Sequence, residues 1–298
     1  MDTAASPPPQ LRADYRKLAA LYQDRRTPDR LLAHYLVERR LADSFRASTR
    51  QERENGAYNQ LYDTLLREVH DHPRRAATHV PTDDYIKRQV RMLLRELRRD
   101  DVFVDIGGGD CRVALAVASH VTKSIVVDVT DELVPTVAEA PNFQFVLTKS
   151  ADVPLPDASV SFIYSNQVIE HIHPDDVGER MEELYRVLKP GGRYLCRTPN
   201  KLSGPHDVSM YFDAVARGTH MCEYTYASLA RTMREAGFVK PRLIIAPRAY
   251  RMFEIPFALS RPIEAVFTGV PPSMHTGICR SPIGRALLGI TLMVEKPL

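Results

Sequence analysis

Three consecutive glycines flanked by acidic residues are the first feature of the sequence that could support chemistry. The segment Asp105-Ile-Gly-Gly-Gly-Asp-Cys111 follows an apolar run at 102–106 and precedes a helical pattern at 112–119. Glycine allows a sharp backbone turn and a close approach to a ligand, although a plain strand-to-helix turn would use the same residues. A second acid, Asp128, ends the next apolar run. In a doubly wound sheet both acids would lie at the ligand-binding edge, where Asp128 could accept hydrogen bonds from ribose hydroxyls.

Two cofactors compete for this arrangement. The dinucleotide fingerprint G-x-G-x-x-G would need glycine or alanine at position 112, where the chain has Arg112. It would also leave Asp105 without a role. A nucleoside that carries methionine explains Asp105, because a carboxylate at that place would lie near the ammonium of the amino acid. The residues therefore favour S-adenosylmethionine over a dinucleotide.

Five motifs in succession resemble those of class I S-adenosylmethionine-dependent methyltransferases. They are Val102-Phe-Val-Asp-Ile-Gly-Gly-Gly-Asp110, Val126-Val-Asp-Val129, Pro154-Leu-Pro-Asp157, Ser165-Asn-Gln-Val-Ile-Glu-His171 and Leu188-Lys-Pro-Gly-Gly192. They occur in the family's order across residues 82–246. Two departures concern the cofactor contacts. Cys111 stands where the family usually has a third glycine, and the acid that often lies near the adenine amine is either replaced by Lys149 or displaced to Asp152.

The resemblance implies a fold and a cofactor site. The fold would be a doubly wound, Rossmann-like α/β sheet of seven strands whose final strand is antiparallel. The methionine end of the cofactor would lie near Asp105, the ribose on Asp128, and the adenine near Ser150 to Asp152. The expected cofactor-binding residues are Asp105, Gly107, Gly109, Asp128, Val129, Ala151, Asp152 and Asn166.

The pattern of apolar residues supports the same fold independently. Apolar runs of about five residues alternate with helical patterns after residue 81, which is typical of a parallel sheet covered on both faces. Residues 1–80 show a Pro-rich tail and then helical spacing without strands, which predicts a helical cap. We expect a methyltransferase domain at 81–298, with substrate-covering loops at 198–225 and 247–285.

Composition excludes several classes of protein. The net charge is +3, and no block of basic residues with interleaved aromatics suggests a nucleic-acid partner. The arginine-rich amino-terminal third could face an anionic ligand or form a solvated helical surface. Four cysteines show no zinc spacing, and no apolar run is long enough to span a membrane. We expect a cytoplasmic protein that acts on a small molecule, as a monomer or a homo-oligomer.

The residues after the fourth predicted strand could carry proton chemistry. Glu170 is the favoured general base, because it shares one short segment with Asn166 and Gln167. An ordinary ion pair is the alternative for Glu170, and His171 could be a base or a packing residue. In the loop that follows the fifth strand, a metal site of His206, Asp207, His220 and Glu223 is conceivable, but the spacing is irregular and we assign no metal ligand.

Apolar residues beside basic helices suggest an acceptor with a hydrocarbon part and an anionic part. The segment Asn166–Glu170 and the predicted cap resemble those of bacterial prenyl-diphosphate C-methyltransferases of terpenoid biosynthesis. That resemblance implies geranyl or farnesyl diphosphate as acceptor, Mg²⁺ on the diphosphate, and Glu170 as the base that deprotonates a carbocation. The expected substrate residues are Arg53, Tyr58, Gln167, Asn200, His206, Met210, Tyr211 and Phe212.

Two alternatives remain open. One is O-methylation of a sugar or another hydroxylated metabolite, in which His171, His206 or His220 would take the hydroxyl proton. The other is a cofactor-binding protein without catalysis.

Overall fold

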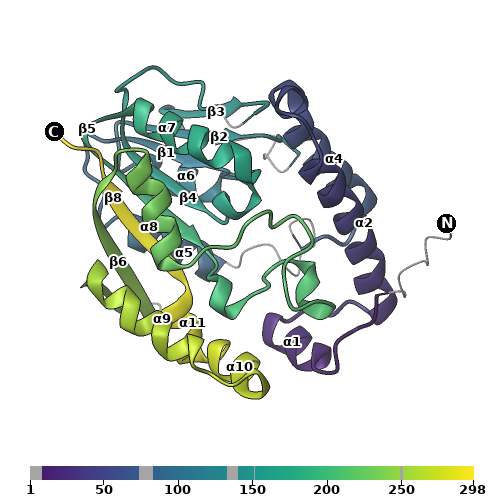
Figure 1. The fold of residues 1–298 in the computed structure, drawn as a ribbon. Coiled ribbons are helices and arrows are strands. Elements are labelled where there is room, and N and C mark those ends of the chain that lie inside the picture. The colour runs from purple at the N-terminus through teal and green to yellow at the C-terminus, as the bar shows by residue number, and fades with distance from the viewer. Residues whose placement is uncertain (1–8, 74–82, 133–139, 151, 249–250) are drawn as a thin grey trace.

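One sheet of eight strands organises the part of the chain that the computed structural model describes, residues 9–73, 83–132, 140–150, 152–248 and 251–298 (Figure 1). The strands are β1 (Val102–Ile106), β2 (Lys123–Asp128), β3 (Phe143–Leu147), β4 (Val160–Asn166), β5 (Leu188–Thr198), β6 (Val239–Arg248), β7 (Arg251–Pro256) and β8 (Ile290–Glu295). Their order across the sheet is β3-β2-β1-β4-β5-β8-β6-β7.

The first five strands pair in parallel, and β8 is antiparallel to both β5 and β6. The predicted α/β class and the antiparallel final strand are therefore confirmed. The predicted count of seven strands is wrong, because β7 adds an antiparallel edge strand beside β6. Prolines interrupt the sequence around β7, so its pattern did not predict a strand. At a sheet edge proline is tolerated, and Pro256 stands at the end of β7, opposite Arg242.

Apolar residues cover both faces of the central strands. Val104 and Ile106 face one buried cluster, which includes Met181 and Leu184, whereas Phe103 faces a second cluster on the opposite side. Successive side chains of a strand point to opposite faces, so a strand buried on both sides needs a continuous apolar run. This is why the apolar runs in the sequence predicted these strands well.

Helices cover both faces of the sheet and one of its ends. They are α1 (Tyr15–Tyr22), α2 (Pro28–Arg46), α3 (Arg50–Glu52), α4 (Tyr58–Glu68), α5 (Asp83–Leu93), α6 (Arg112–Ala118), α7 (Val177–Val187), α8 (Tyr226–Glu235), α9 (Ser260–Thr268), α10 (Pro272–Cys279) and α11 (Pro282–Leu288). Buried residues of α7 and α8 belong to one sheet-face cluster and those of α5 and α6 to the other. Among the described helices, none combines the length and the apolar character needed to cross a bilayer.

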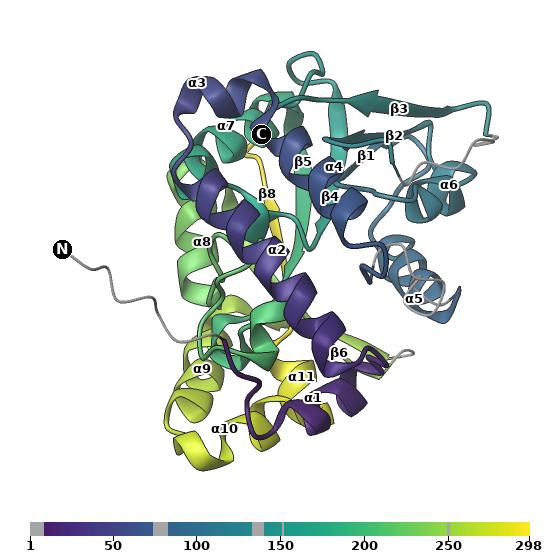
Figure 2. The same cartoon turned by 90° about the vertical axis from the view of Figure 1, so that its right-hand side faces the viewer.

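The amino-terminal helices α1 and α2 pack against the loop that follows β5. Figures 1 and 2 show α2 and α4 running side by side, and buried residues of α4 share a cluster with α7. Leu31 and Tyr35 of α2 form a separate apolar cluster with Val208, Met210 and Tyr211 of the loop. The predicted boundary between residues 80 and 81 lies outside the described residues.

Candidate functional site

The glycine segment after β1 forms the floor of a cavity. Gly107 and Gly109 have φ angles of 69° and 51°, in the left-handed region that favours glycine. A Cβ on Gly107 would lie 2.5 Å from Cγ2 of Val168, so the space there admits no side chain. Asp105, Gly107, Gly109 and Asn166 all line this cavity. The carboxyl end of β1, the glycine turn and the carboxyl end of β4 therefore line the same cavity.

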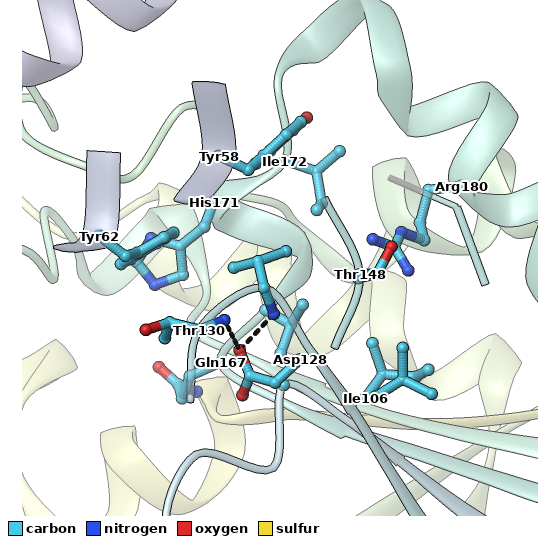
Figure 3. A pocket seen from close by; sticks show the side chains of 14 residues that line it. Tyr58, Tyr62, Ile106, Asp128, Thr130, Thr148, Gln167, His171, Ile172 and Arg180 are labelled. Carbon is cyan, nitrogen blue, oxygen red and sulfur yellow. Dashed lines mark hydrogen bonds between the residues drawn. The ribbon is translucent and has the colours of Figure 1, made fainter. Parts of the chain in front are cut away.

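Asp128 links the glycine segment to a second, adjoining cavity. Its Oδ2 accepts a hydrogen bond from the Gly109 amide at 2.9 Å. Its Oδ1 accepts from the Val129 amide at 2.7 Å and the Thr130 amide at 3.3 Å (Figure 3). These backbone donors fix the carboxylate at the carboxyl end of β2. Each carboxylate oxygen can accept more than one hydrogen bond, so Asp128 keeps capacity for ligand hydroxyls.

Three carboxylates gather around the glycine segment. Burial raises the pKa of Asp105, and the charges of Asp128 and Asp110 raise it further. Asp105 is 3% exposed, which makes the cost of its charge large in the absence of a cationic partner. An anionic pyrophosphate would be repelled here. A ligand with an ammonium and a sulfonium group fits the charge of this site.

The second cavity is closed by α4 and α7. Figure 3 shows Tyr62 and His171 on one side of Asp128 and Arg180 on the other. Arg180 is buried, and burial lowers the pKa of its guanidinium. Its Nη2 donates to the Ser150 carbonyl at 3.2 Å, whereas Nε and Nη1 have no hydrogen-bond partner among the described residues. These buried donors face a cavity in which a heterocyclic base could accept from them.

A third cavity, of about 320 Å³, adjoins the first two. It lies between α2, α4 and the loop that follows β5. Its wall contains five histidines and four charged residues: His34, His72, His171, His206, His220, Asp24, Arg26, Glu38 and Asp207. Arg26 pairs with Asp24 at 2.6 Å, so the one arginine of this lining is neutralised by a neighbouring carboxylate. The third cavity therefore combines these titratable groups with apolar and aromatic side chains such as Leu65, Met210 and Tyr211, and it carries no excess of positive charge.

Several residues are shared between the cavities, and Gln167 and His171 are two of them. Gln167 lines all three, and His171 lines the second and third. Gln167 adopts a φ of 60°, an uncommon left-handed conformation for a side chain of this kind. His171 Nδ1 lies 3.0 Å from the Thr219 carbonyl oxygen, which can only accept, so Nδ1 carries the hydrogen and Nε2 the lone pair in the neutral ring.

His220 stands beside His171, with ring centroids 4.7 Å apart. Burial lowers the pKa of His220, but its 2.8 Å hydrogen bond to Glu223 and the charges of Asp207 and Glu170 outweigh burial and raise the pKa to about 9. Glu170 lies behind this pair. Its Oε2 accepts from Thr198 Oγ1 at 2.9 Å, and burial raises the pKa of its carboxyl.

Comparison with known proteins identifies the family. Residues 76–240, more than half of the chain, match the family described as a methyltransferase domain.

This chain belongs to the methyltransferase domain family.

The curated relatives of this methyltransferase domain agree with the match. A probable S-adenosylmethionine-dependent methyltransferase of Mycolicibacterium smegmatis is 39% identical over 88 residues, which are 30% of this chain and 32% of the relative. A ubiquinone/menaquinone biosynthesis C-methyltransferase of Rubrivivax gelatinosus is 36% identical over 96 residues, 31% of this chain and 37% of the relative. This chain thus spans about a third of the length of these relatives. The matched region is a class I S-adenosylmethionine-dependent methyltransferase domain.

Solved structures of methyltransferases share the fold. A phosphoethanolamine N-methyltransferase of Haemonchus contortus superposes with a TM-score of 0.54 at 14% identity, covering 81% of this chain and 50% of that chain. A methyltransferase of Haloferax volcanii in complex with its activator gives a TM-score of 0.51 at 18% identity, covering 72% of this chain and 92% of that one.

Most of the expected cofactor residues of the methyltransferase domain meet at two adjoining cavities. Asp105, Gly107, Gly109 and Asn166 line the first, and Asp128 and Val129 line the second. Asp152 is exposed and lines neither, and Ala151 lies outside the described residues. The expected residues of the methionine and ribose ends thus line adjoining cavities. The second cavity is also lined by Thr148 and Arg180, which the sequence did not single out.

Four of the eight expected substrate residues line the third cavity: Gln167, His206, Met210 and Tyr211. Asn200 lines a separate pocket beside Gln167. Phe212 stacks on Tyr35 with centroids 4.4 Å apart and lines none of the described cavities.

The other two expected substrate residues both contact Asp176. Arg53 forms a two-pronged ion pair with the buried Asp176, with both N–O distances at 2.8 Å. Tyr58 donates to the same carboxylate at 2.8 Å and lines the second cavity. The roles of Arg53 and Tyr58 in substrate binding stay predictions, and in this structure both side chains donate to Asp176.

The expected general base, Glu170, does not line the third cavity. Its side chain is 0% exposed and lines none of the described cavities. It contacts the site through the two histidines, His171 and His220, one side-chain atom of each residue lying within 4.8 Å of the others.

The sequence did not predict that residues of α2 line the third cavity. His34 and Glu38 lie on the buried face of α2, four residues apart, and Glu38 accepts hydrogen bonds from the Thr219 amide and hydroxyl at 2.8 and 2.7 Å. A polar pair at helical spacing within an apolar stripe was the signal that could have revealed them.

Proposed function

We propose that this chain transfers a methyl group from S-adenosylmethionine to a hydroxyl group of a small, polyhydroxylated metabolite. The observation that carries the proposal is the set of hydrogen-bonding side chains in the third cavity, hereafter the acceptor cavity, which shares Gln167 and His171 with the two cofactor cavities. This is the alternative that the sequence left open beside prenyl-diphosphate methylation. The activity of the whole protein is part of the proposal, because its curated relatives are matched over only part of their length.

The cofactor is held by residues whose chemistry suits it. Asp105 would bind the ammonium, Asp128 the ribose hydroxyls, and Arg180 would donate to the adenine nitrogens. When bound, S-adenosylmethionine supplies an electrophilic methyl group. The protein must bring an acceptor oxygen into line with that methyl group and keep it there.

His171 is placed to hold the acceptor hydroxyl at the junction. Its imidazole belongs to both the second and the third cavity, and the Thr219 carbonyl fixes its orientation. Around it, Arg26, Glu38 and Asp207 offer charged donors and acceptors of the kind that bind multiple hydroxyls. A sugar or a similar polyol would find partners for its polar groups in such a cavity.

The charge of the cavity makes a prenyl diphosphate the weaker candidate. Burial lowers the pKa of His206 to about 4, so this histidine is neutral near pH 7. Arg26 already has a carboxylate partner, and Asp207 adds a further acid. A diphosphate needs several uncommitted cationic donors when it is removed from water. The same acids would favour neutral or cationic acceptors.

Purified protein with labelled S-adenosylmethionine tests the proposal. One arm supplies sugars and other hydroxylated metabolites, and the other supplies geranyl or farnesyl diphosphate with Mg²⁺. We expect label in a methyl ether from the first arm. Label in a hydrocarbon product of the second arm, with none in the first, would refute the proposal. Cofactor binding without transfer to any component of a metabolite extract would instead support a non-catalytic role.

His171→Ala is the matched variant for this assay, and His206→Ala is its control in the same cavity. We expect His171→Ala to lose most turnover while S-adenosylhomocysteine binds nearly as well as to the wild type. His206→Ala should change the KM for the acceptor more than kcat, because His206 lines the acceptor cavity away from the junction with the cofactor. Full turnover in His171→Ala would remove His171 from the reaction.

A further inference from the structure

The junction of the cavities contains three side chains with the composition of a metal site. Glu170, His171 and His220 each offer one ligand atom, and these atoms lie within 4.8 Å of one another. Glu170 and His171 belong to the short helical turn after β4, and His220 belongs to the loop before α8. Two imidazoles and one carboxylate on one side of a cation leave positions open for other ligands.

The two histidines are held by their other nitrogen atoms. Nδ1 of His171 donates to the Thr219 carbonyl at 3.0 Å, and Nδ1 of His220 lies 2.8 Å from Oε1 of Glu223. Histidines that bind metals usually donate their second ring N–H to a carbonyl or a carboxylate, which fixes the ring and the tautomer. This pattern leaves Nε2 as the nitrogen through which each ring could bind a cation.

Glu170 supplies a second, independent observation. Its side chain is 0% exposed, and its Oε1 has no hydrogen-bond partner among the described residues. The other oxygen accepts from Thr198 at 2.9 Å, so the carboxylate is held in position. A buried carboxylate oxygen without a partner is costly, and a bound cation would remove that cost.

The surrounding charges favour a cation as well. Glu223 and Asp207 lie close enough to His220 for their charges to act on it, and Glu170 adds a third carboxylate. These three carboxylates outnumber the two imidazoles of His171 and His220. A divalent cation would offset their mutual repulsion.

A second group of similar composition is less suitable. His34, Glu38 and His72 also place one ligand atom each within a short distance of the others. However, the guanidinium of Arg26 lies against Nδ1 of His34. A fixed positive charge at that place would repel a cation, so the group around Glu170 is the better site.

We propose that Glu170, His171 and His220 bind one divalent transition-metal cation whose open positions face the acceptor cavity. Imidazole ligands favour Zn²⁺, Mn²⁺, Co²⁺ or Fe²⁺ over Mg²⁺, so this site differs from the Mg²⁺ that a diphosphate acceptor would carry. His171 and His220 both line the acceptor cavity, and Glu170 closes the site from behind.

The cation gives a route for the hydroxyl proton, and this part of the inference rests on the proposed function. An acceptor hydroxyl bound to the cation loses its proton to water in the cavity, because a bound cation lowers the pKa of its oxygen ligands. The oxygen then forms a bond to the methyl carbon as the bond between that carbon and the sulfonium sulfur breaks. His171 serves as a ligand and holds the hydroxyl through the metal.

Titration of the metal-free full-length protein with Co²⁺, followed by the visible absorption of the ion, tests the site. We expect one Co²⁺ per chain, competed by Zn²⁺. Glu170→Gln and His220→Gln should weaken binding by at least about 100-fold, since loss of an outer partner alone typically weakens it by about 10- to 100-fold. Glu223→Gln should fall in that smaller range. His34→Gln is the matched control and should bind Co²⁺ as the wild type does.

Each outcome decides the inference. Thermal unfolding must first show that the variants are folded. If Glu170→Gln does not fold, the milder variant Glu223→Gln tests the site in its place. Loss of binding in His34→Gln but not in His220→Gln, or no binding at all, would overturn the site. Methyl transfer by metal-free protein would overturn the metal's role and leave the proposed function standing. Stoichiometric binding that the ligand variants abolish, without transfer to any hydroxylated acceptor, would overturn the proposed function and leave the site standing.

Discussion

Asp105→Asn tests the assignment of the cofactor's ammonium to the end of β1. The substitution keeps the shape of the side chain and removes its charge. Asp105 is buried, and a hydrogen bond between charged groups contributes about 1.5–3 kcal/mol. At 1.36 kcal/mol for each factor of ten, the affinity for S-adenosylhomocysteine should fall by about 10- to 150-fold.

The structure predicts the opposite direction for stability. Burial and the charges of Asp128 and Asp110 raise the pKa of Asp105, so its ionised form destabilises the free protein near pH 7. A carboxyl whose pKa is raised on folding contributes stability below its unfolded pKa and loses it as pH rises through the folded pKa. Asp105→Asn should therefore have a free energy of unfolding at neutral pH that is equal to or above that of the wild type.

Isothermal titration with S-adenosylhomocysteine between pH 4 and neutrality completes the test. The ammonium needs the ionised carboxylate, so wild-type affinity should fall as pH drops through the raised pKa of Asp105, by up to about tenfold per unit. The variant should show a flatter profile over this range. Asp110→Asn is the comparison variant: Asp110 is partly exposed and paired with Arg112 at 2.8 Å, and its charge helps to raise the pKa of Asp105. Its loss should therefore move the fall in affinity to lower pH without flattening the profile. Wild-type affinity in Asp105→Asn, with an unchanged pH profile, would refute the reasoning.

Three further substitutions test other parts of the structure. Gly107→Ala would place a Cβ 2.5 Å from Val168 at a left-handed φ, and denaturant unfolding should show a loss of about 1–3 kcal/mol; an unchanged midpoint would contradict the described turn. Arg53→Met leaves the buried Asp176 without its ion partner and should cost about 3 kcal/mol of stability. The KM for the acceptor should stay near that of the wild type, and a large rise in KM would identify Arg53 as a substrate residue. Burial opposes ionisation of Glu38, but its hydrogen bonds outweigh burial and hold its pKa below the ordinary value, so stability from this carboxylate is present above about pH 4.5 and lost as pH falls. Glu38→Gln should reduce that loss in acid unfolding curves, and identical curves would show that the carboxylate contributes nothing.

The strands and the cofactor end of the site could be predicted from the sequence because their determinants are local. The strands Val102–Ile106, Phe143–Leu147 and Ile290–Glu295 lie where the apolar runs indicated. Asp105 and Asp128 meet because parallel strands of one sheet share an edge for their carboxyl ends, so knowing the two strands is enough.

The acceptor cavity could not be predicted in the same way. It joins His34 and Glu38 of α2 to Thr219 and His220, more than 170 residues later in the chain. Nothing local in either segment shows that they meet. The ion pair of Arg53 was missed for the same reason, since its partner Asp176 lies 123 residues away.

Helix α4 is a wall shared by two binding sites. Tyr58 lines the cofactor cavity, Leu65 lines the acceptor cavity, and Tyr62 lines both. Any ligand that settles this helix in one position prepares the other site as well, so the two binding free energies are coupled. Thermodynamic reciprocity then fixes a relation between them: S-adenosylhomocysteine must change the affinity for the acceptor by the same factor as the acceptor changes the affinity for S-adenosylhomocysteine. A single shared helix would thus set one coupling factor for both ligands, whichever of them binds first.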